Sequence, residues 1–157
     1  MLKTKTIIIY ESIYGNTKKV ADAIAEGIRE SGQVECSVAK TGEVHHTDDL
    51  AGYDAILFGC PNHNQEPARN MLKFIERASI VDLEEKMGAA FDTYTGGNKG
   101  IALGKLEEVI AQRMPCVKFV IEGFSAKVED RKGPLTEGEL QRANEFGRQV
   151  AEKLLDR

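Results

Sequence analysis

The sequence has 157 residues, of which 41% are hydrophobic and 29% charged, and its formal net charge at pH 7 is −4. The acidic balance excludes the basic face that a non-specific nucleic-acid binder needs, and no apolar stretch approaches the roughly 20 residues that cross a bilayer. The first residues lack the apolar run of a signal peptide, and the three scattered cysteines form no disulfide or zinc pattern. These features predict a single cytoplasmic domain over residues 1–157, with no nucleic-acid or membrane partner and no bound metal.

Short apolar runs alternate with amphipathic ones through the first half of the chain. Three successive β-branched residues, Ile7 to Ile9, are typical of a strand that is buried on both faces. Val20, Ile24 and Ile28 lie four residues apart, which places them on one face of a helix. The elements predicted here are strands at residues 4–10, 34–39 and 53–59, a helix at 16–31, and a polar loop at 41–52 with a short helix near 47–50.

The second half of the chain continues the same alternation. Leu72, Ile75 and Ala78 recur at helical spacing. Thr136 and Glu139 have the spacing of a capping box, which predicts the start of the last helix. The elements predicted here are helices at residues 65–79, 100–114 and from 136 onward, strands at 87–91 and 117–121, and a polar loop at 123–135.

Five strands that alternate with helices predict an α/β domain built on a three-layer, doubly wound five-stranded parallel sheet. Right-handed crossovers leave few topologies for such a sheet, and the strand order 2-1-3-4-5 is a common one. In this order the ligand site lies beyond the carboxyl ends of the first and third strands, where the order reverses. The loops that meet there are residues 10–17, 59–65 and 92–100.

The first of these loops runs from a buried strand directly into a helix. Such a junction directs unpaired backbone N–H groups and the positive end of the helix dipole toward the loop, where an anion can bind. Ser12 and Thr17 add hydroxyl groups. Gly15 permits a tight turn, and Asn16 can cap the helix. The motifs G-x-x-x-x-G-K-[ST] and G-x-G-x-x-G, which bind triphosphates and dinucleotides, are absent. The residue types alone allow either a phosphate-binding loop or an ordinary capped turn.

This loop resembles the phosphate loop of the flavodoxin family, whose pattern T/S-x-T-G-x-T stands here as Ser12-Ile13-Tyr14-Gly15-Asn16-Thr17. The resemblance covers the whole chain, because the order of strands and helices, the other two loops and the length agree with the short-chain branch of the family. It implies a flavodoxin-like fold and a bound FMN whose phosphate lies in this loop. Tyr14 departs from the pattern, since the family usually has threonine there, and one hydroxyl donor is lost; Lys18 and Lys19 can partly compensate.

The second loop resembles the flavodoxin loop that packs against the inner face of the isoalloxazine ring. His63 takes the position of the usual tryptophan, and an imidazole can also stack on a flavin. Asn64 takes a position where the family has glycine or asparagine, which both tolerate a positive φ. In the family this peptide turns so that its carbonyl accepts a hydrogen bond from N5–H of the reduced flavin. The resemblance thus implies that Pro61, Asn62, His63 and Asn64 bind the cofactor.

The third loop resembles the one whose backbone binds the pyrimidine end of the flavin and whose aromatic residue covers the outer face of the ring. The resemblance assigns Tyr94 to the outer stack, and it assigns the pyrimidine end to Asp92, Thr93, Gly96 and Gly97. A carboxylate of Asp92 near the pyrimidine would repel an anionic reduced flavin. A low reduction potential is therefore expected.

The resemblance implies an FMN-binding, low-potential electron carrier that shuttles single electrons between redox partner proteins, as a monomer and without catalytic residues. The alternative is an FMN-dependent NAD(P)H:quinone or nitro-compound oxidoreductase of the same fold, which would need access for the nicotinamide and usually a dimer interface. The short loops of the chain favour the carrier. A phosphoacceptor receiver has the same strand order, but Glu11 stands alone where that class needs an acidic pair. Asp54 and Lys118 also lie at the wrong ends of their strands for that class.

Overall fold

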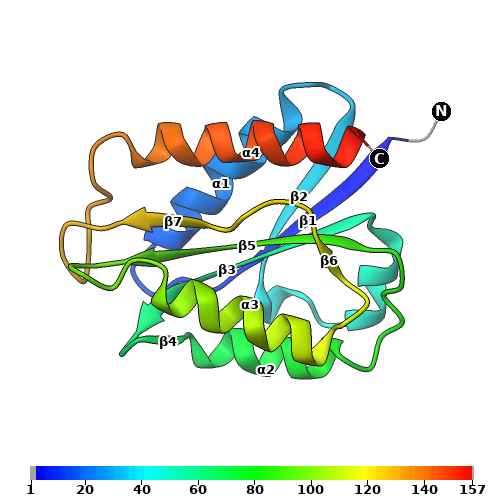
Figure 1. The fold of residues 1–157 in the computed structure, drawn as a ribbon, viewed down its shortest axis with the longest axis horizontal. Coiled ribbons are helices and arrows are strands. Elements are labelled where there is room, and N and C mark those ends of the chain that lie inside the picture. Colours follow the sequence, from blue (N-terminus) through cyan, green and yellow to red (C-terminus); the bar gives the residue numbers. More distant parts are fainter. Residues whose placement is uncertain (1–2, 157) are drawn as a thin grey trace.

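A parallel sheet lies between two layers of helices in the computed structural model, which describes residues 3–156 (Figure 1). The strands are β1 (Thr4–Tyr10), β2 (Val34–Lys40), β3 (Ala55–His63), β4 (Glu66–Pro67), β5 (Met87–Tyr94), β6 (Lys118–Phe119) and β7 (Phe124–Lys127). The α-helices are α1 (Asn16–Arg29), α2 (Arg69–Ala78), α3 (Ile101–Arg113) and α4 (Glu139–Leu155), and short 3-10 helices span Thr41–Glu43 and Thr47–Gly52. Helices α1 and α4 cover one face of the sheet and α2 and α3 the other, which confirms the predicted three layers (Figure 1).

The strand order β2-β1-β3-β5-β6 confirms the predicted 2-1-3-4-5 topology. These strands are parallel: Ile8 of β1 pairs with Val38 of β2 and with Leu57 of β3, and Leu57 pairs in turn with Ala89 of β5. Two short strands lie off this path, since β4 turns back antiparallel to β3 and β7 lies parallel to the second half of β5. The carboxyl ends of β1 and β3 therefore meet where the strand order reverses.

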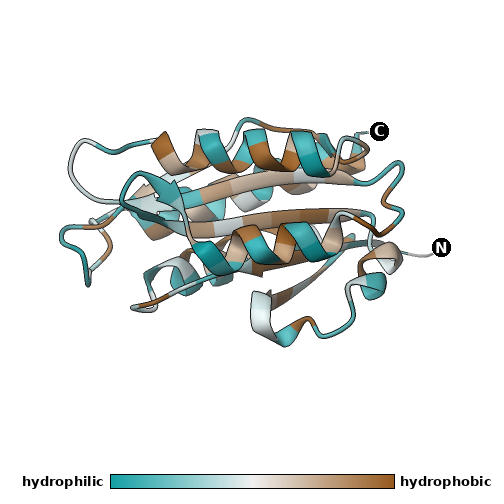
Figure 2. Ribbon diagram, turned by 90° about the horizontal axis from the view of Figure 1, so that it is seen from below, coloured by the Kyte–Doolittle hydropathy of each residue, from teal (hydrophilic) through white to brown (hydrophobic). Residues whose placement is uncertain are grey.

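Apolar side chains fill both faces of the sheet, because neighbouring residues of a strand point to opposite faces. Ile8 and Leu57 pack with the apolar stripes of α1 and α4. Ile9 and Phe58 pack on the other face with α2 and α3. Figure 2 shows hydrophobic residues along the strands and polar residues on the outer turns of the helices. Among residues 3–156, no helix combines the length and the apolar character needed to cross a membrane.

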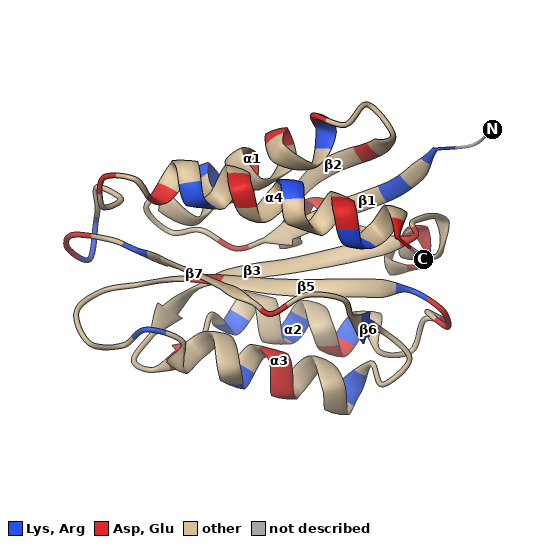
Figure 3. Ribbon diagram, turned by 45° about the horizontal axis from the view of Figure 1, so that its top comes forward, with Lys and Arg blue, Asp and Glu red and all other residues tan. Residues whose placement is uncertain are grey.

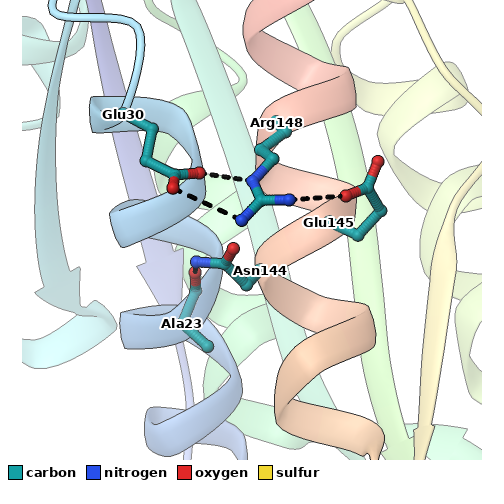
Figure 4. Close-up of polar contacts among 5 residues, drawn as sticks. All are labelled: Ala23, Glu30, Asn144, Glu145 and Arg148. Carbon is teal, nitrogen blue, oxygen red and sulfur yellow. Dashed lines mark hydrogen bonds and ion pairs between the residues drawn. The ribbon is translucent and has the colours of Figure 1, made fainter.

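Helices α1 and α4 approach each other closely because each has a glycine at their contact. A Cβ atom on Gly147 would lie 2.1 Å from the carbonyl oxygen of Ile24, and one on Gly27 would lie 2.0 Å from that of Asn144. Figure 4 shows the polar edge of this contact, where Asn144 Nδ2 donates to the carbonyl oxygen of Ala23 at 3.3 Å. The two helices therefore form one firmly packed layer over the sheet.

The third strand is longer than predicted, and the second helix begins later. β3 continues through His63 instead of ending at residue 59, and it turns back as a hairpin into β4. Asn64 and Gln65 form the turn with φ values of 50° and 68°, a left-handed conformation that an α-helix does not include. The helix predicted to begin in this turn begins at Arg69 instead.

The fifth predicted strand is interrupted. Within residues 117–121 only the two-residue strand β6 forms, and the polar loop predicted at residues 123–135 contains strand β7. Gly123 lies between β6 and β7, where a Cβ atom would lie 2.8 Å from Cδ1 of Leu103. β5 continues to Tyr94 rather than ending at residue 91 as predicted. Residues 92 and 93 pair with the lengthened β3 on one side, and residues 92 to 94 pair with β7 on the other.

The last helix begins at Glu139, and the predicted capping box is not formed. The N-cap residue is Gly138, with a φ of 89°, and no side chain caps the helix. The Glu139 carboxylate instead accepts a hydrogen bond from Lys127 N–H at 2.6 Å and pairs with Arg142 at 2.6 Å. The buried hydroxyl group of Thr136 has no hydrogen-bond partner within residues 3–156. Glu139 therefore links the start of α4 to β7, and it does not take part in a capping box.

Candidate functional site

Residues from all three predicted loops surround one open cleft at the carboxyl edge of the sheet. Its volume is about 860 Å³, within the range of roughly 300–1,000 Å³ that is typical of small-molecule and cofactor sites. Strands β1, β3 and β5 each lead into it. The residues that line the cleft are Ser12, Ile13, Tyr14, Asn16, Thr17, Pro61, Asn62, His63, Asn64, Gln65, Thr93, Tyr94, Thr95, Asn98, Val128 and Arg131.

The side chain of Ser12 shapes the loop between β1 and α1. Its Oγ accepts hydrogen bonds from the N–H groups of Gly15, at 3.1 Å, and Lys18, at 3.4 Å. Gly15 is the N-cap residue of α1 and has a φ of 91°, a conformation that glycine adopts without strain. Gly15 therefore shapes the turn but is not one of the residues that line the cleft.

Backbone N–H groups remain available at the start of α1. Within residues 3–156, those of Tyr14, Asn16 and Thr17 have no acceptor on the protein. The Thr17 hydroxyl group is already paired, because it lies 2.9 Å from the hydroxyl of Thr93 in a buried contact. Free N–H groups at the start of a helix, together with its dipole, favour a bound anion. The loop thus offers a phosphate these backbone N–H groups, and the Thr17 hydroxyl can add a donor when Thr93 is the donor in their contact.

The hairpin from β3 into β4 forms the second wall of the cleft. Asn62 Oδ1 accepts a hydrogen bond from Gln65 N–H at 2.8 Å, which closes the turn. Asn62 Nδ2 is buried and has no acceptor within the described part of the chain. His63 and Asn64 are exposed, and the positive φ of Asn64 is one that asparagine tolerates. A buried donor without a partner at the wall of a cleft fits an acceptor atom supplied by a ligand.

The third wall comes from the end of β5 and the turn that follows. Thr93 and Tyr94 belong to the strand rather than to a loop. Tyr94 lines the cleft although only 8% of its surface is exposed, and burial raises the pKa of its phenol. Gly96 and Gly97 lie in the turn and do not line the cleft. The fixed ring of Tyr94 is thus the aromatic surface at this wall.

Asp92 is a predicted site residue that the structure places away from the cleft. Its side chain is fully buried, and its carboxylate accepts hydrogen bonds from Ser125 Oγ at 2.6 Å and Leu103 N–H at 3.0 Å. Thr93 points toward α1, where it meets Thr17, so the alternation along β5 turns Asp92 toward α3. Burial raises the pKa of this carboxyl group to about 6 despite the two bonds. The structure therefore places Asp92 outside the cleft lining, and the position of this carboxyl group gives no argument for a low reduction potential.

Some residues that line the cleft were not among the predicted site residues. Val128 and Arg131 follow β7, in the segment predicted as a polar loop. The alternation of Phe124, Ala126 and Val128 with polar residues is the signal that could have revealed this strand. The others are Gln65, Thr95 and Asn98, which lie within the predicted loops 59–65 and 92–100 but were not among the predicted cofactor-binding residues.

Comparison with known proteins shows what the chain is similar to. A sequence model of the flavodoxin domain matches residues 7–100. A flavodoxin of Clostridium saccharobutylicum is 32% identical, over 96% of this chain and 97% of its own. An NAD(P)H dehydrogenase (quinone) of Archaeoglobus fulgidus is 29% identical, over 94% of this chain and 96% of its own. Among solved structures, a flavodoxin from the domain Archaea superposes with a TM-score of 0.81 at 28% identity, covering 97% of this chain and 99% of that one.

Proposed function

The chain belongs to the flavodoxin family, and on this premise we propose that it binds FMN in the cleft and carries single electrons between redox proteins. The observation that supports this most is the cleft itself, which combines free N–H groups at the start of α1 with a buried amide donor that lacks an acceptor. FMN, when bound, would supply reversible one-electron chemistry. The residues of the chain hold the cofactor and set its surroundings.

The phosphate end of the cofactor is assigned to the loop before α1. The free N–H groups of Tyr14, Asn16 and Thr17 would donate to the phosphate oxygens. Ser12 keeps these groups in place through its two hydrogen bonds within the loop. Ile13 is exposed beside them and lines the cleft, where it would flank the bound group.

The flavin ring is assigned to the space between the hairpin and the end of β5. Tyr94 would cover one face of the ring, with Pro61 and His63 on the other. The unpartnered Nδ2 of Asn62 would donate to a polar atom on the edge of the ring. The peptide at Asn64 already has the positive φ that places its carbonyl in a tight turn. These residues surround the ring without supplying a group that reacts with a substrate.

A second candidate is an FMN-dependent oxidoreductase, and the relative named NAD(P)H dehydrogenase (quinone) is the observation that favours it. The carrier is preferred because the loops around the cleft are short. Oxidation of NADH or NADPH with a quinone present separates the two functions. Sustained turnover without a separate reductase would establish the oxidoreductase; a carrier in the cytoplasm would instead need donor and acceptor proteins.

Titration of the cofactor-free protein with FMN, riboflavin and FAD tests whether the cleft binds FMN. We expect tight binding of FMN over riboflavin, followed by two separate one-electron potentials on stepwise reduction. Ser12→Ala should weaken FMN binding by several-fold and riboflavin binding less, because loss of such a turn-closing side chain costs about 1 kcal/mol. Ser31→Ala is the matched control, since Ser31 Oγ also accepts a backbone N–H in a turn, that of Gln33, outside the cleft. Equal affinity for FMN and riboflavin would contradict the assignment of the loop.

A further inference from the structure

We propose that Arg131, on the loop after β7, supplies a positive charge to the phosphate of the bound flavin and so strengthens the preference for FMN over riboflavin, a role that rests on the proposed function above. A phosphate monoester carries about −1.5 to −2 charges at pH 7. The start of a helix offers only about half a positive charge. A cation at this end of the cleft would therefore complete the site.

The loop that carries Arg131 is fixed at its base. Val128 N–H donates to the carbonyl oxygen of Tyr94 at 2.8 Å, and Val128 pairs with Leu135 in an antiparallel bridge. Closer to the tip, Glu129 N–H donates to the carbonyl oxygen of Pro134 at 2.8 Å. These bonds join the loop both to the end of β5 and to itself. Its tip therefore has a defined place at the rim of the cleft.

The tip of the loop contacts the start of α1. A Cβ atom on Gly133 would lie 2.8 Å from Asn16 Oδ1, so the missing side chain lets the two loops meet. The Lys132 ammonium group lies 6.0 Å from the centre of the Tyr14 ring, at the outer limit of a cation–π contact. Tyr14 is the residue that departs from the family pattern, and here it has a partner on this loop. Arg131, next to Lys132 in the chain, lines the cleft.

The guanidinium group of Arg131 is available to a ligand. Within residues 3–156, none of the ion pairs involves it. The neighbouring carboxylate of Asp130 accepts a hydrogen bond from the main-chain N–H of Arg131 at 2.7 Å. A guanidinium group can donate two parallel hydrogen bonds to a phosphate. Because Arg131 is exposed and water screens its charge, we expect an effect on affinity of about tenfold rather than more.

Binding of FMN and riboflavin to the full chain, freed of cofactor, tests this role. The two flavins share the ring and ribityl chain and differ by the phosphate, so their affinity ratio isolates the phosphate end. Arg131→Gln removes the charge and Arg131→Lys keeps it without the planar guanidinium group. Arg113→Gln is the matched control, because Arg113 is an exposed arginine in the last turn of α3 and does not line the cleft.

We expect Arg131→Gln to weaken FMN binding about tenfold, to leave riboflavin binding unchanged, and to reduce the salt dependence of FMN binding. Arg131→Lys should restore part of the preference, and Arg113→Gln should change neither affinity. An unchanged affinity of Arg131→Gln for FMN, or equal losses for both flavins, would overturn the role of Arg131 while leaving the proposed function in place. A wild-type protein that binds neither flavin would overturn both.

Discussion

Asp92 is a carboxylic acid that the fold buries at the end of β5, and burial raises its pKa from 3.8 to about 6. The folded protein therefore binds this proton more tightly than the unfolded chain does, so the free energy of unfolding should fall as the pH rises from about 4 to 6. A pKa difference of this size is worth at most about 3 kcal/mol. Asp92→Asn cannot ionise, and it keeps an acceptor for Leu103 N–H and gains a donor for Ser125 Oγ. We expect the stability of Asp92→Asn relative to the wild type to increase between pH 4 and pH 7 in urea unfolding.

The control for this pH dependence is Asp48→Asn, which changes an exposed carboxylate in the short 3-10 helix before β3. Its unfolding free energy should follow that of the wild type across the same range. The free energies of unfolding of Asp92→Asn and the wild type can instead run parallel from pH 4 to pH 7. In that case Asp92 does not titrate in this range, and burial of its carboxylate does not lower the stability.

Asn62 Oδ1 accepts a hydrogen bond from Gln65 N–H, whereas Asn62 Nδ2 has no acceptor within residues 3–156. Asn62→Asp keeps an oxygen for Gln65 N–H but removes the donor and adds a negative charge. We expect it to weaken riboflavin binding by about tenfold, since an unpaired donor matched by a ligand is worth about 1–2 kcal/mol, and FMN binding by at least as much, because the new charge also repels the phosphate. Fluorescence titration of both flavins measures this, and a loss confined to FMN would contradict the assignment of Asn62 to the ring end.

Asp92 and Thr93 are neighbours in one predicted loop, but their side chains lie on opposite faces of the sheet. The sequence does not show this difference. Asp92 and Thr93 were both assigned to the loop after a strand that ended at residue 91. Pairing with β3 and β7 continues that strand to Tyr94, and alternation then turns Thr93 to Thr17 and Asp92 to the core near α3. Residue type and local order could place both at the carboxyl edge of the sheet, but only the long-range pairing decides which of them reaches the cleft.

The packing of α1 on α4 depends on glycines at their contact. In Gly147→Ala the new Cβ would lie 2.1 Å from the carbonyl oxygen of Ile24, and a backbone atom cannot give way as a side chain can. We expect a loss of about 1–3 kcal/mol in the free energy of unfolding, typical of overpacking. Gly104→Ala is the matched control, because Gly104 is exposed in α3 with open space around it.

Gly104→Ala should stabilise the protein by about 0.5–1 kcal/mol, since alanine favours the helix and restricts the unfolded chain. Chemical unfolding of both variants measures the two effects. A Gly147→Ala variant as stable as Gly104→Ala would show that the two helices can separate at no cost.

Elements with a strong local pattern could be predicted, and those defined by pairing could not. The isoleucine run predicts β1 and the apolar stripe predicts α1 without any long-range information, and both elements begin at the predicted residues. β6 and β7 together replace one predicted strand, because each pairs with a different part of β5. The polar loop predicted at residues 123–135 includes Arg131, but only the pairing of β7 beside β5 brings this residue to the cleft.

Apart from the buried carboxyl groups of Glu11, Asp92 and Glu139, the charged residues that the structure describes lie outside the core of the molecule. Figure 3 shows the acidic and basic residues on the helices and on the loops at the sheet ends, while most of each strand carries neither. The alternation of elements in the sequence left few strand orders, and the resemblance to the flavodoxin family selected the one observed, which places the cleft at this edge. Its exact lining depends on three loops and the segment after β7, whose contacts no local pattern encodes.

The fold also predicts a monomer with one complete site per chain. Within the described residues, neither edge of the main sheet path favours addition of another strand. The β2 edge carries charged Glu35 and Lys40, and β6 at the other edge has only two residues. Sedimentation analysis should therefore give a mass near 17.3 kDa with and without FMN, and titration should saturate at one FMN per chain. A mass that doubles when FMN is added would instead contradict the monomer and favour the oxidoreductase alternative, which usually has a dimer interface.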